Sequence, residues 1–255
     1  MQDSYTVHPI GIFHSDAKYP YDVPRQGAVA DTSAGVIRLH PNCHFEDALA
    51  DLDGFDTIWV IFLFHQNQNW HPMVRPPRHT DRKVGLFATR SPYRPNPIGI
   101  SAVHLERIQG LELWISRHDL LDGTPILDIK PYLPYADSFP YASRGWTNEN
   151  PELEYKVIFS QEAERQLQWL ENNGVPRIRS FLLAQLGYDP QNASLHRLID
   201  SAIAYRTWRA FFTVDDEHAV TVTHILSGYS PEDLVSPDDH YGDKAIHREY
   251  NRLFP

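Results

Sequence analysis

Hydrophobic residues in the first half of the chain occur in short runs separated by Gly, Pro, Asn or Asp. Seven runs rich in Ile, Val, Leu, Phe or Trp fall between residues 7 and 132, and each has the length of a β-strand. Residues 100–108 alternate in polarity, which predicts a half-buried strand, whereas residues 57–64 are apolar on both faces and should be central in a sheet. Repeated short strands with turn residues between them indicate a closed or nearly closed β-barrel. Residues 42–51 have helical spacing of Phe45, Ala48 and Leu49.

The pattern changes to a helical period after residue 159. Ser160 reads as a helix N-cap, because Ala163, Leu167 and Leu170 then lie on one face of a helix. Further on, we expect a second helix over 176–186 with Gly187 as its stop, a third over 195–205, and a β-hairpin formed by 208–214 and 219–226 around an acidic turn.

The sequence therefore predicts a mixed β and α+β protein with an N-terminal β-barrel of short strands and a smaller C-terminal α+β domain. We expect the barrel over 1–145, the α+β domain over 155–229, and an acidic polar tail over 230–255 with no assigned function. The stretch 135–151, which carries Pro, Gly and Asn residues, is the expected linker.

Composition and charge narrow the class of protein. The chain has 255 residues, 42% of them hydrophobic, and a formal net charge of −10, which argues against nonspecific binding of nucleic acid. Between residues 75 and 94, however, six basic residues face a single acid, so a local patch could still contact phosphates or instead neutralise acids elsewhere in the fold. The single cysteine, the absence of a signal-peptide pattern and the short apolar runs favour a cytoplasmic protein that does not enter a membrane.

Residues 85–99, GLFATRSPYRPNPIG, form the most distinctive stretch of the chain. Two arginines, three prolines and an asparagine fall within ten positions, 90–99. Prolines restrict their own φ and the residue before them, so the loop is stiff and holds its arginines in place to meet an anion or a planar base. The alternative is a proline-rich crossover whose arginines are merely solvated.

Two other kinds of site find little support. Fourteen histidines suggest a metal, but the cluster His40, Cys43 and His44 has no second group of ligands and no H-E-x-x-H motif is present, so we expect no metal site. A G-x-G-x-x-G loop is also absent, which argues against a Rossmann-type cofactor site.

Five motifs in a fixed order carry a resemblance that covers about residues 7–142. They are 24–26 (PRQ), 54–66 ending in His65-Gln66, 75–78 (RPPR), 85–99, and 119–132 (DLLDGTPILDIKPY). Together they resemble the TsaA/TrmO family of tRNA N6-adenosine methyltransferases. The resemblance implies a β-barrel enzyme that uses S-adenosyl-L-methionine (SAM), acts on N6 of threonylcarbamoyladenosine at position 37 beside the tRNA anticodon, and forms a homodimer with the cofactor site near the subunit contact. One departure, Gln191 after Asp189-Pro190 where the family often has Arg, puts tRNA contact at that turn in doubt.

The resemblance also implies a set of cofactor contacts. Gln26 and Gln66 could read an adenine edge, Arg25 or Arg90 could clamp the methionyl carboxylate, and Asp122 could accept hydrogen bonds from the ribose or the ammonium group. Asp122-Gly123 is also a common β-turn dipeptide, and a histidine at the end of a strand, like His65, is often a rim residue. The full set is Pro24, Arg25, Gln26, His65, Gln66, Arg90, Leu121, Asp122, Gly123 and Thr124.

For a methyl transfer to an exocyclic amine, Asn96 and Asp128 are the candidate acceptors of the amine protons. Asn96-Pro97 is analogous to the start of the tetrapeptide of DNA amino-methyltransferases, although Ile98 stands where an aromatic residue would stack. Asp128 could equally be a structural partner of Lys130. The candidate tRNA contacts are Arg75, Arg78, Arg94, Arg206 and Arg209, the last two of which could also be ordinary exposed arginines around Trp208. A non-enzymatic RNA- or nucleotide-binding module that uses the same pocket as a sensor is the alternative function.

Overall fold

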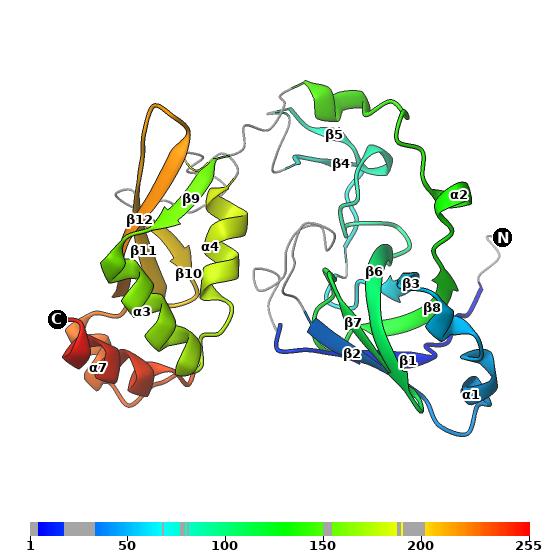
Figure 1. Cartoon of the computed structure of the whole chain (residues 1–255), viewed down its shortest axis with the longest axis horizontal. Coiled ribbons are helices and arrows are strands. Elements are labelled where there is room, and N and C mark those ends of the chain that lie inside the picture. Colours follow the sequence, from blue (N-terminus) through cyan, green and yellow to red (C-terminus); the bar gives the residue numbers. More distant parts are fainter. Residues whose placement is uncertain are drawn as a thin grey trace. The chain divides into compact units, whose positions relative to one another are not determined.

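The computed structural model describes residues 5–17, 34–67, 69–76, 80, 82–149, 155–187, 190 and 202–255. The chain divides into two compact units, Met1–Pro151 and Glu152–Pro255 (Figure 1), and each is described by itself. In the part of the chain described, no helix combines the length and the apolar character needed to cross a bilayer.

Six antiparallel strands of the first unit close into a barrel in the order β1-β2-β7-β6-β3-β8 (Figure 1). The prediction of a barrel is confirmed, and so is the central position of residues 57–64, because β3 pairs with β6 on one side and with β8 on the other. The strands are β1 (Gly11–His14), β2 (Ala34–Leu39), β3 (Thr57–Leu63), β6 (Ile98–Gln109), β7 (Glu112–Ser116) and β8 (Pro125–Pro131).

Side chains that alternate along the strands fill the barrel. Ile58, Val60 and Phe62 of β3 are buried, and their neighbours in the strand are less so. At Gly35 and Gly99 a Cβ atom would overlap the rings of Phe13 and Phe62, so these glycines leave space for aromatic rings in the core.

Shorter elements connect the barrel strands. They are α1 (Phe45–Ala48), η2 (Leu52–Gly54), β4 (Met73–Val74), β5 (Val84–Gly85), η3 (Leu86–Ala88), α2 (Pro134–Asp137) and η4 (Gly145–Asn148), where η marks a 3₁₀ turn. The helix expected over 42–51 is only four residues long, since His44 just before it and Asp51 three residues after it adopt left-handed backbone angles, with φ of 58° and 64°. The expected linker 135–151 is tied to the first unit, because Trp59 Nε1 donates to Asp137 and Trp146 Nε1 donates to the Ala88 carbonyl.

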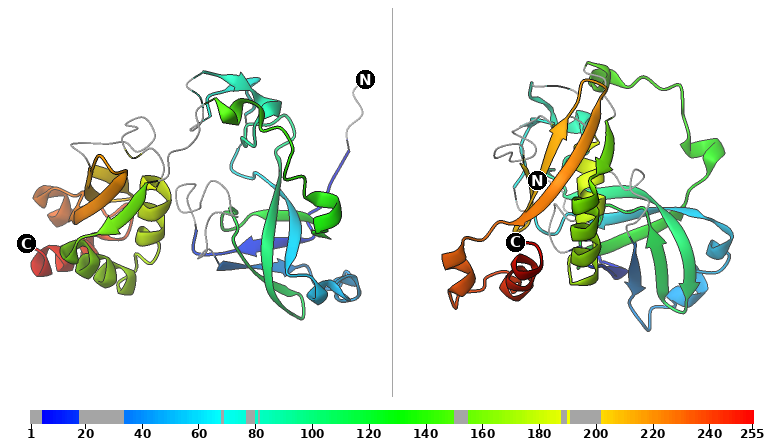
Figure 2. Two further views of the ribbon diagram at one scale, coloured as in Figure 1. Left: turned by 45° about the horizontal axis from the view of Figure 1, so that its top comes forward. Right: turned by 60° about the vertical axis from the view of Figure 1, so that its left-hand side comes forward.

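The second unit is a four-stranded sheet with helices against one face. Strand order is β10-β11-β12-β9, with β9 parallel to β12 and the other pairs antiparallel. Figure 2 shows α3 and α4 beside this sheet, and Val220, Val222 and Ile225 of β12 are buried in the core they share. The elements are β9 (Lys156–Phe159), α3 (Gln161–Asn172), α4 (Ile178–Leu186), β10 (Ala202–Tyr205), β11 (Trp208–Val214), β12 (Ala219–Ser227), α6 (Pro231–Val235) and α7 (Lys244–Leu253).

In the second unit, predictions that depend on a few neighbouring residues are confirmed more often than predictions of whole elements. Ser160 caps α3 by accepting a hydrogen bond from the Ala163 N–H at 3.0 Å, and β11 with β12 forms the expected hairpin. The third helix expected over 195–205 is wrong at its end, because Ala202–Tyr205 is strand β10, paired with β11; residues 195–201 lie outside the described part. The stretch 230–255, expected as a polar tail, contains α6 and α7, and its residues His247 and Tyr250 are fully buried.

Candidate functional site

Strand register brings several of the predicted site segments to one end of the barrel. Near the end of β3, Leu63 pairs with Ile98 at the start of β6, and Phe62 pairs with Ile126 at the start of β8. Near the end of β1, Ile12 pairs with Pro125. Antiparallel pairing therefore places the residues after β1, after β3, before β6 and before β8 at the same end of the barrel. Three of the motifs singled out in the sequence contribute described residues to this end: the segment that ends in His65-Gln66, the proline-rich loop 85–99, and residues 119–132.

The residues after β3 are fixed to the loop that precedes β6. The Phe64 N–H donates to the Pro97 carbonyl at 2.7 Å, and the His65 N–H donates to the Leu63 carbonyl at 2.9 Å. The side chains of His65 and Gln66 are exposed at this point. Both are therefore accessible to a ligand, in positions fixed by backbone hydrogen bonds.

The proline-rich loop is held by backbone hydrogen bonds to the segment before it. Leu86 N–H donates to the Pro72 carbonyl at 3.0 Å, and His71 N–H donates to the Tyr93 carbonyl at 3.1 Å. Within the loop, the hydroxyl of Thr89 donates to the Leu86 carbonyl at 2.8 Å and accepts from a neighbouring N–H. The loop is therefore braced from outside as well as stiffened by its prolines.

Its two arginines differ in their surroundings. Arg94 is half-buried; its guanidinium donates to the Thr89 carbonyl at 2.9 Å and lies 5.8 Å from the centre of the exposed Phe87 ring. Arg90 is exposed and close enough to Asp119 for its positive charge to act on that carboxyl group. Arg94 therefore helps to shape the loop, whereas Arg90 is available to a ligand.

Residues 121–124 form the β-turn that the Asp-Gly dipeptide predicts. Gly123 has a φ of 76°, which favours glycine, and its N–H donates to the Phe13 carbonyl at 2.9 Å. Oδ1 of Asp122 accepts from the Ser15 N–H at 3.1 Å and lies 3.5 Å from His14 Nδ1. The Asp122 side chain thus fastens the turn to the end of β1, and its Oδ2 has no hydrogen-bond partner among the described residues.

Asp119 belongs to the site, although the sequence analysis did not select it. Burial raises the pKa of its carboxyl group above the usual range, while a hydrogen bond from Ser101 and the positive charge of Arg90 oppose the rise. The Ser101 hydroxyl donates to Asp119 Oδ1 at 2.5 Å. A carboxyl group perturbed in this way marks a candidate functional position. The only hint in the sequence is that Asp119 opens the motif that contains Asp122.

The two residues expected to act on the amine have different surroundings. Asn96 is exposed in the loop before β6, and its carbonyl accepts from the Ile98 N–H at 2.7 Å. Asp128 lies within β8, where its carboxylate is 2.8 Å from Lys130 Nζ and also accepts from the Ile129 N–H. Among the described residues, no contact joins Asn96 to Asp128. The ion pair with Lys130 agrees with the alternative that Asp128 is a structural partner of that lysine.

The predicted tRNA-contacting arginines fall into both units. Arg75 is exposed, and the neighbouring Arg82 is engaged by Glu149, which accepts from its Nε at 3.2 Å and from its Nη2. In the second unit, Arg206 lies in the β10–β11 turn, Arg209 lies in β11 just after it, and both are half-buried. Arg78 and the cofactor candidates Pro24, Arg25 and Gln26 lie outside the described residues. Over the described ranges, no group of three or more His, Cys, Asp or Glu side chains is arranged to hold a metal ion.

Comparison with known proteins gives a consistent result. Residues 12–138 match the family model described as the tRNA-methyltransferase O N-terminal domain. The tRNA (adenine(37)-N6)-methyltransferase of Escherichia coli K12 is 37% identical over 218 residues, which cover 83% of this chain and 92% of that protein. A Pseudomonas aeruginosa protein named as a putative S-adenosylmethionine-dependent methyltransferase is 43% identical over 166 residues, 64% of this chain and 69% of that one.

Solved structures agree in fold. The crystal structure of TrmO from Pseudomonas aeruginosa superposes with a TM-score of 0.64 at 30% identity, over 88% of this chain and 99% of that one. The sequence match extends over nearly the whole length of the Escherichia coli protein, and the structural match extends through both parts of the chain. The chain therefore belongs to the TrmO family, named for tRNA-methyltransferase O.

Proposed function

We propose that this protein is a SAM-dependent methyltransferase that methylates N6 of adenosine 37 in tRNA, and that its substrate is the threonylcarbamoylated form of that adenosine. The proposal is supported by family membership, since the Escherichia coli relative bears the name of this reaction. The observation that carries it is the gathering of Gln66, Arg90, Asp119 and the Asp122 turn at one end of the barrel.

The residues at this end fit the chemistry of SAM. Arg90 is an exposed cation that can pair with a methionyl carboxylate, and the Gln66 amide can both donate to and accept from an adenine edge. Asp122 Oδ2 can accept from an ammonium or ribose hydroxyl, and Gly123 leaves room beside it. We infer that Pro24, Arg25 and Gln26, together with His65, Leu121 and Thr124, complete the cofactor site.

When bound, SAM supplies a methyl group activated by its sulfonium. The protein's part is to hold the amine in line with that methyl group, which can contribute up to about 7–11 kcal/mol. We assign Asn96 to accept a proton of the amine, so that the nitrogen lone pair turns toward the methyl group. Asp128 is assigned the same kind of role, provided that its carboxylate leaves Lys130. A strong base is not needed, because the nitrogen becomes acidic once it is methylated.

We infer that tRNA is bound by arginines of each unit: Arg75, Arg78 and Arg94 in the first, and Arg206 and Arg209 in the second. Local positive charge can bind phosphates while the net charge of −10 discourages nonspecific binding. A homodimer located in the cytoplasm completes the proposal, and light scattering of the purified protein tests the dimer.

The experiment is methyl transfer from radiolabelled SAM to tRNA with and without the threonylcarbamoyl group, followed by mass spectrometry of the nucleosides. We expect a methyl group on N6 of modified adenosine 37, at a rate reduced at least tenfold by Asn96→Ala. Asp128→Asn should reduce the rate as well, whereas Lys83→Ala is the control. SAM binding without turnover on either tRNA would favour the sensor function instead.

A further inference from the structure

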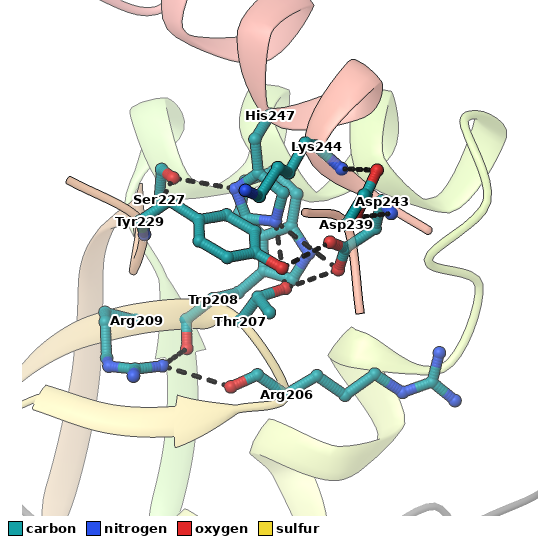
Figure 3. A network of polar contacts seen from close by, with 10 residues as sticks. All are labelled: Arg206, Thr207, Trp208, Arg209, Ser227, Tyr229, Asp239, Asp243, Lys244 and His247. Carbon is teal, nitrogen blue, oxygen red and sulfur yellow. Dashed lines mark hydrogen bonds and ion pairs between the residues drawn. The ribbon is translucent and has the colours of Figure 1, made fainter. Parts of the chain in front are cut away.

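Helix α7 carries one fully buried histidine, His247, whose side chain lies in the interior of the second unit. The imidazole of His247 stacks on the Trp208 ring, with centroids 3.7 Å apart and planes 10° from parallel. Its Nε2 is 2.9 Å from the Thr207 hydroxyl, and its Nδ1 is 2.7 Å from the Ser227 hydroxyl. Figure 3 shows these side chains converging from the β10–β11 turn, the end of β12 and α7.

The half-buried carboxylate of Asp243 completes this network and fixes the direction of the Thr207 hydrogen bond. Asp243 accepts from the Thr207 hydroxyl at 2.7 Å and from the Tyr229 hydroxyl at 2.8 Å. Burial alone would raise the pKa of Asp243, but hydrogen bonds from His247, Thr207 and Tyr229 outweigh it and lower the pKa to about 2.

An ionised carboxylate only accepts hydrogen bonds, so the single hydroxyl proton of Thr207 points to Asp243. Nε2–H of His247 must then donate to Thr207, so Nε2 carries a proton. Thr207 is therefore the central member of the network, because it donates to Asp243 and accepts from His247.

Thr207 is also one of the two residues of the turn between β10 and β11, and the other is Arg206. Arg206 has a φ of 53°, a left-handed conformation that is unfavourable for a residue with a side chain. The turn backbone is secured as well, since Gly228 N–H donates to the Thr207 carbonyl at 2.6 Å. The guanidinium of Arg209 donates to the carbonyls of Arg206 (3.1 Å) and Trp208 (2.9 Å).

The two arginines at this turn, Arg206 in the turn and Arg209 in β11, differ in the contacts that the structure describes. Arg209 holds the turn backbone through one nitrogen, Nη1. Figure 3 shows the Arg206 side chain extending away from the network, and its guanidinium lies 5.5 Å from the Tyr205 ring centre. An arginine on an aromatic ring, on a turn braced from behind, suits contact with a phosphate or a base.

We propose that the Thr207–Asp243–His247 network is a positioning device through which the C-terminal helix holds Arg206 in the geometry that contacts tRNA. Thr207, Asp243 and His247 act through Arg206 and do not touch the RNA. The proposal rests on the proposed function, because Arg206 is taken there as a tRNA contact.

The test compares two variants that differ in one hydroxyl. Thr207→Val removes the central donor with almost no change in shape, and Thr207→Ser keeps it. Tyr250→Phe is the matched control for stability: it removes the hydrogen bond from Tyr250 to the Ile225 carbonyl (2.7 Å) on the same helix and leaves the turn intact. The readouts are the Kd for tRNA at several salt concentrations, KM and kcat for methyl transfer, and Tm.

We expect Thr207→Val to raise Kd and KM for tRNA by about the same factor as Arg206→Ala, roughly 3–10-fold, and to reduce the salt slope by about 0.7–0.9, with kcat unchanged. The double variant should bind no more weakly than Arg206→Ala alone, and Thr207→Ser should restore binding. Tyr250→Phe should lower Tm and leave Kd unchanged.

The inference is overturned if Thr207→Val binds tRNA like Thr207→Ser, if its effect adds in full to that of Arg206→Ala, or if Tyr250→Phe weakens binding equally. It is also overturned if Arg206→Ala binds normally, an outcome that leaves the methyl-transfer proposal standing. If every variant binds as expected but none transfers a methyl group, the proposed function fails and the positioning role holds.

Discussion

Gly99 ends the proline-rich motif, and its substitution tests how that motif is attached to the barrel. A Cβ atom at this position would overlap the ring of Phe62, which is buried in the barrel core. The ring of Phe62 packs edge-to-face on that of Phe64, with ring centroids 5.2 Å apart, and the Phe64 N–H donates a hydrogen bond to the Pro97 carbonyl. Gly99→Ala should therefore disturb both the core and the site.

The other glycine of the motif provides a matched control. Gly85 has no heavy atom within 4 Å of its Cβ position and a φ of −59°, so alanine fits there without strain. Each Gly→Ala change restricts the unfolded chain, which by itself should stabilise the folded protein by about 0.4–1 kcal/mol. At Gly99 this gain is opposed by overpacking against Phe62, which costs about 1–3 kcal/mol. The two variants should thus differ by about 2 kcal/mol, or about 4–8 °C in the Tm of the first unit.

Calorimetry of the full chain measures the difference, and hydrogen exchange of the barrel strands assigns it to the first unit. Adding Phe62→Leu to Gly99→Ala should recover part of the loss, with a coupling free energy of at least about 0.5 kcal/mol. Equal stability of Gly99→Ala and Gly85→Ala, or strict additivity with Phe62→Leu, would refute the packing argument.

Three further outcomes are expected. Arg90→Ala should weaken SAM binding about 10–100-fold by titration calorimetry, with Lys83→Ala as control, and an unchanged Kd would remove Arg90 from the site. The pKa of Asp243 is about 2, below its unfolded value of about 3.9, so its stabilisation of the second unit is present above about pH 4 and is lost as the pH falls toward 2. Allowing for solvent screening, this stabilisation amounts to about 1 kcal/mol. Asp243→Asn should therefore flatten the plot of unfolding free energy against pH between about pH 4 and pH 2, and an unaltered plot would contradict the argument. Ser160→Ala removes the N-cap of α3 and should cost about 1 kcal/mol in urea unfolding, while an unchanged midpoint would show that the cap is unimportant.

Local signals in the sequence predicted local structure well. The alternation of residues 100–108 belongs to β6, and the Ser160 cap and the Asp122-Gly123 turn appear as expected, because each depends on neighbours in sequence. The helical period that continued through 202–205 failed, because pairing with β11 is a contact that the local pattern does not contain.

The acidic residues after position 229 were misread for a related reason. Asp233 forms a capping box with Ser230 at the start of α6, and Asp239 accepts hydrogen bonds from the N–H groups of Asp243 and Lys244 at the start of α7. In composition these acids resemble a solvated tail, whereas in the structure they begin two helices. Asp119 was missed because its burial and its bond to Ser101 arise only when β6 and the loop before β8 meet.

Hydrogen–deuterium exchange with and without SAM tests most directly whether the loops at one end of the barrel hold the methyl donor. We expect slower exchange in residues 63–67, 86–97 and 119–124 when SAM is present, and no such change in elements of the second unit such as α3. Protection confined to the second unit, or absent from all three segments, would contradict the assignment of the site.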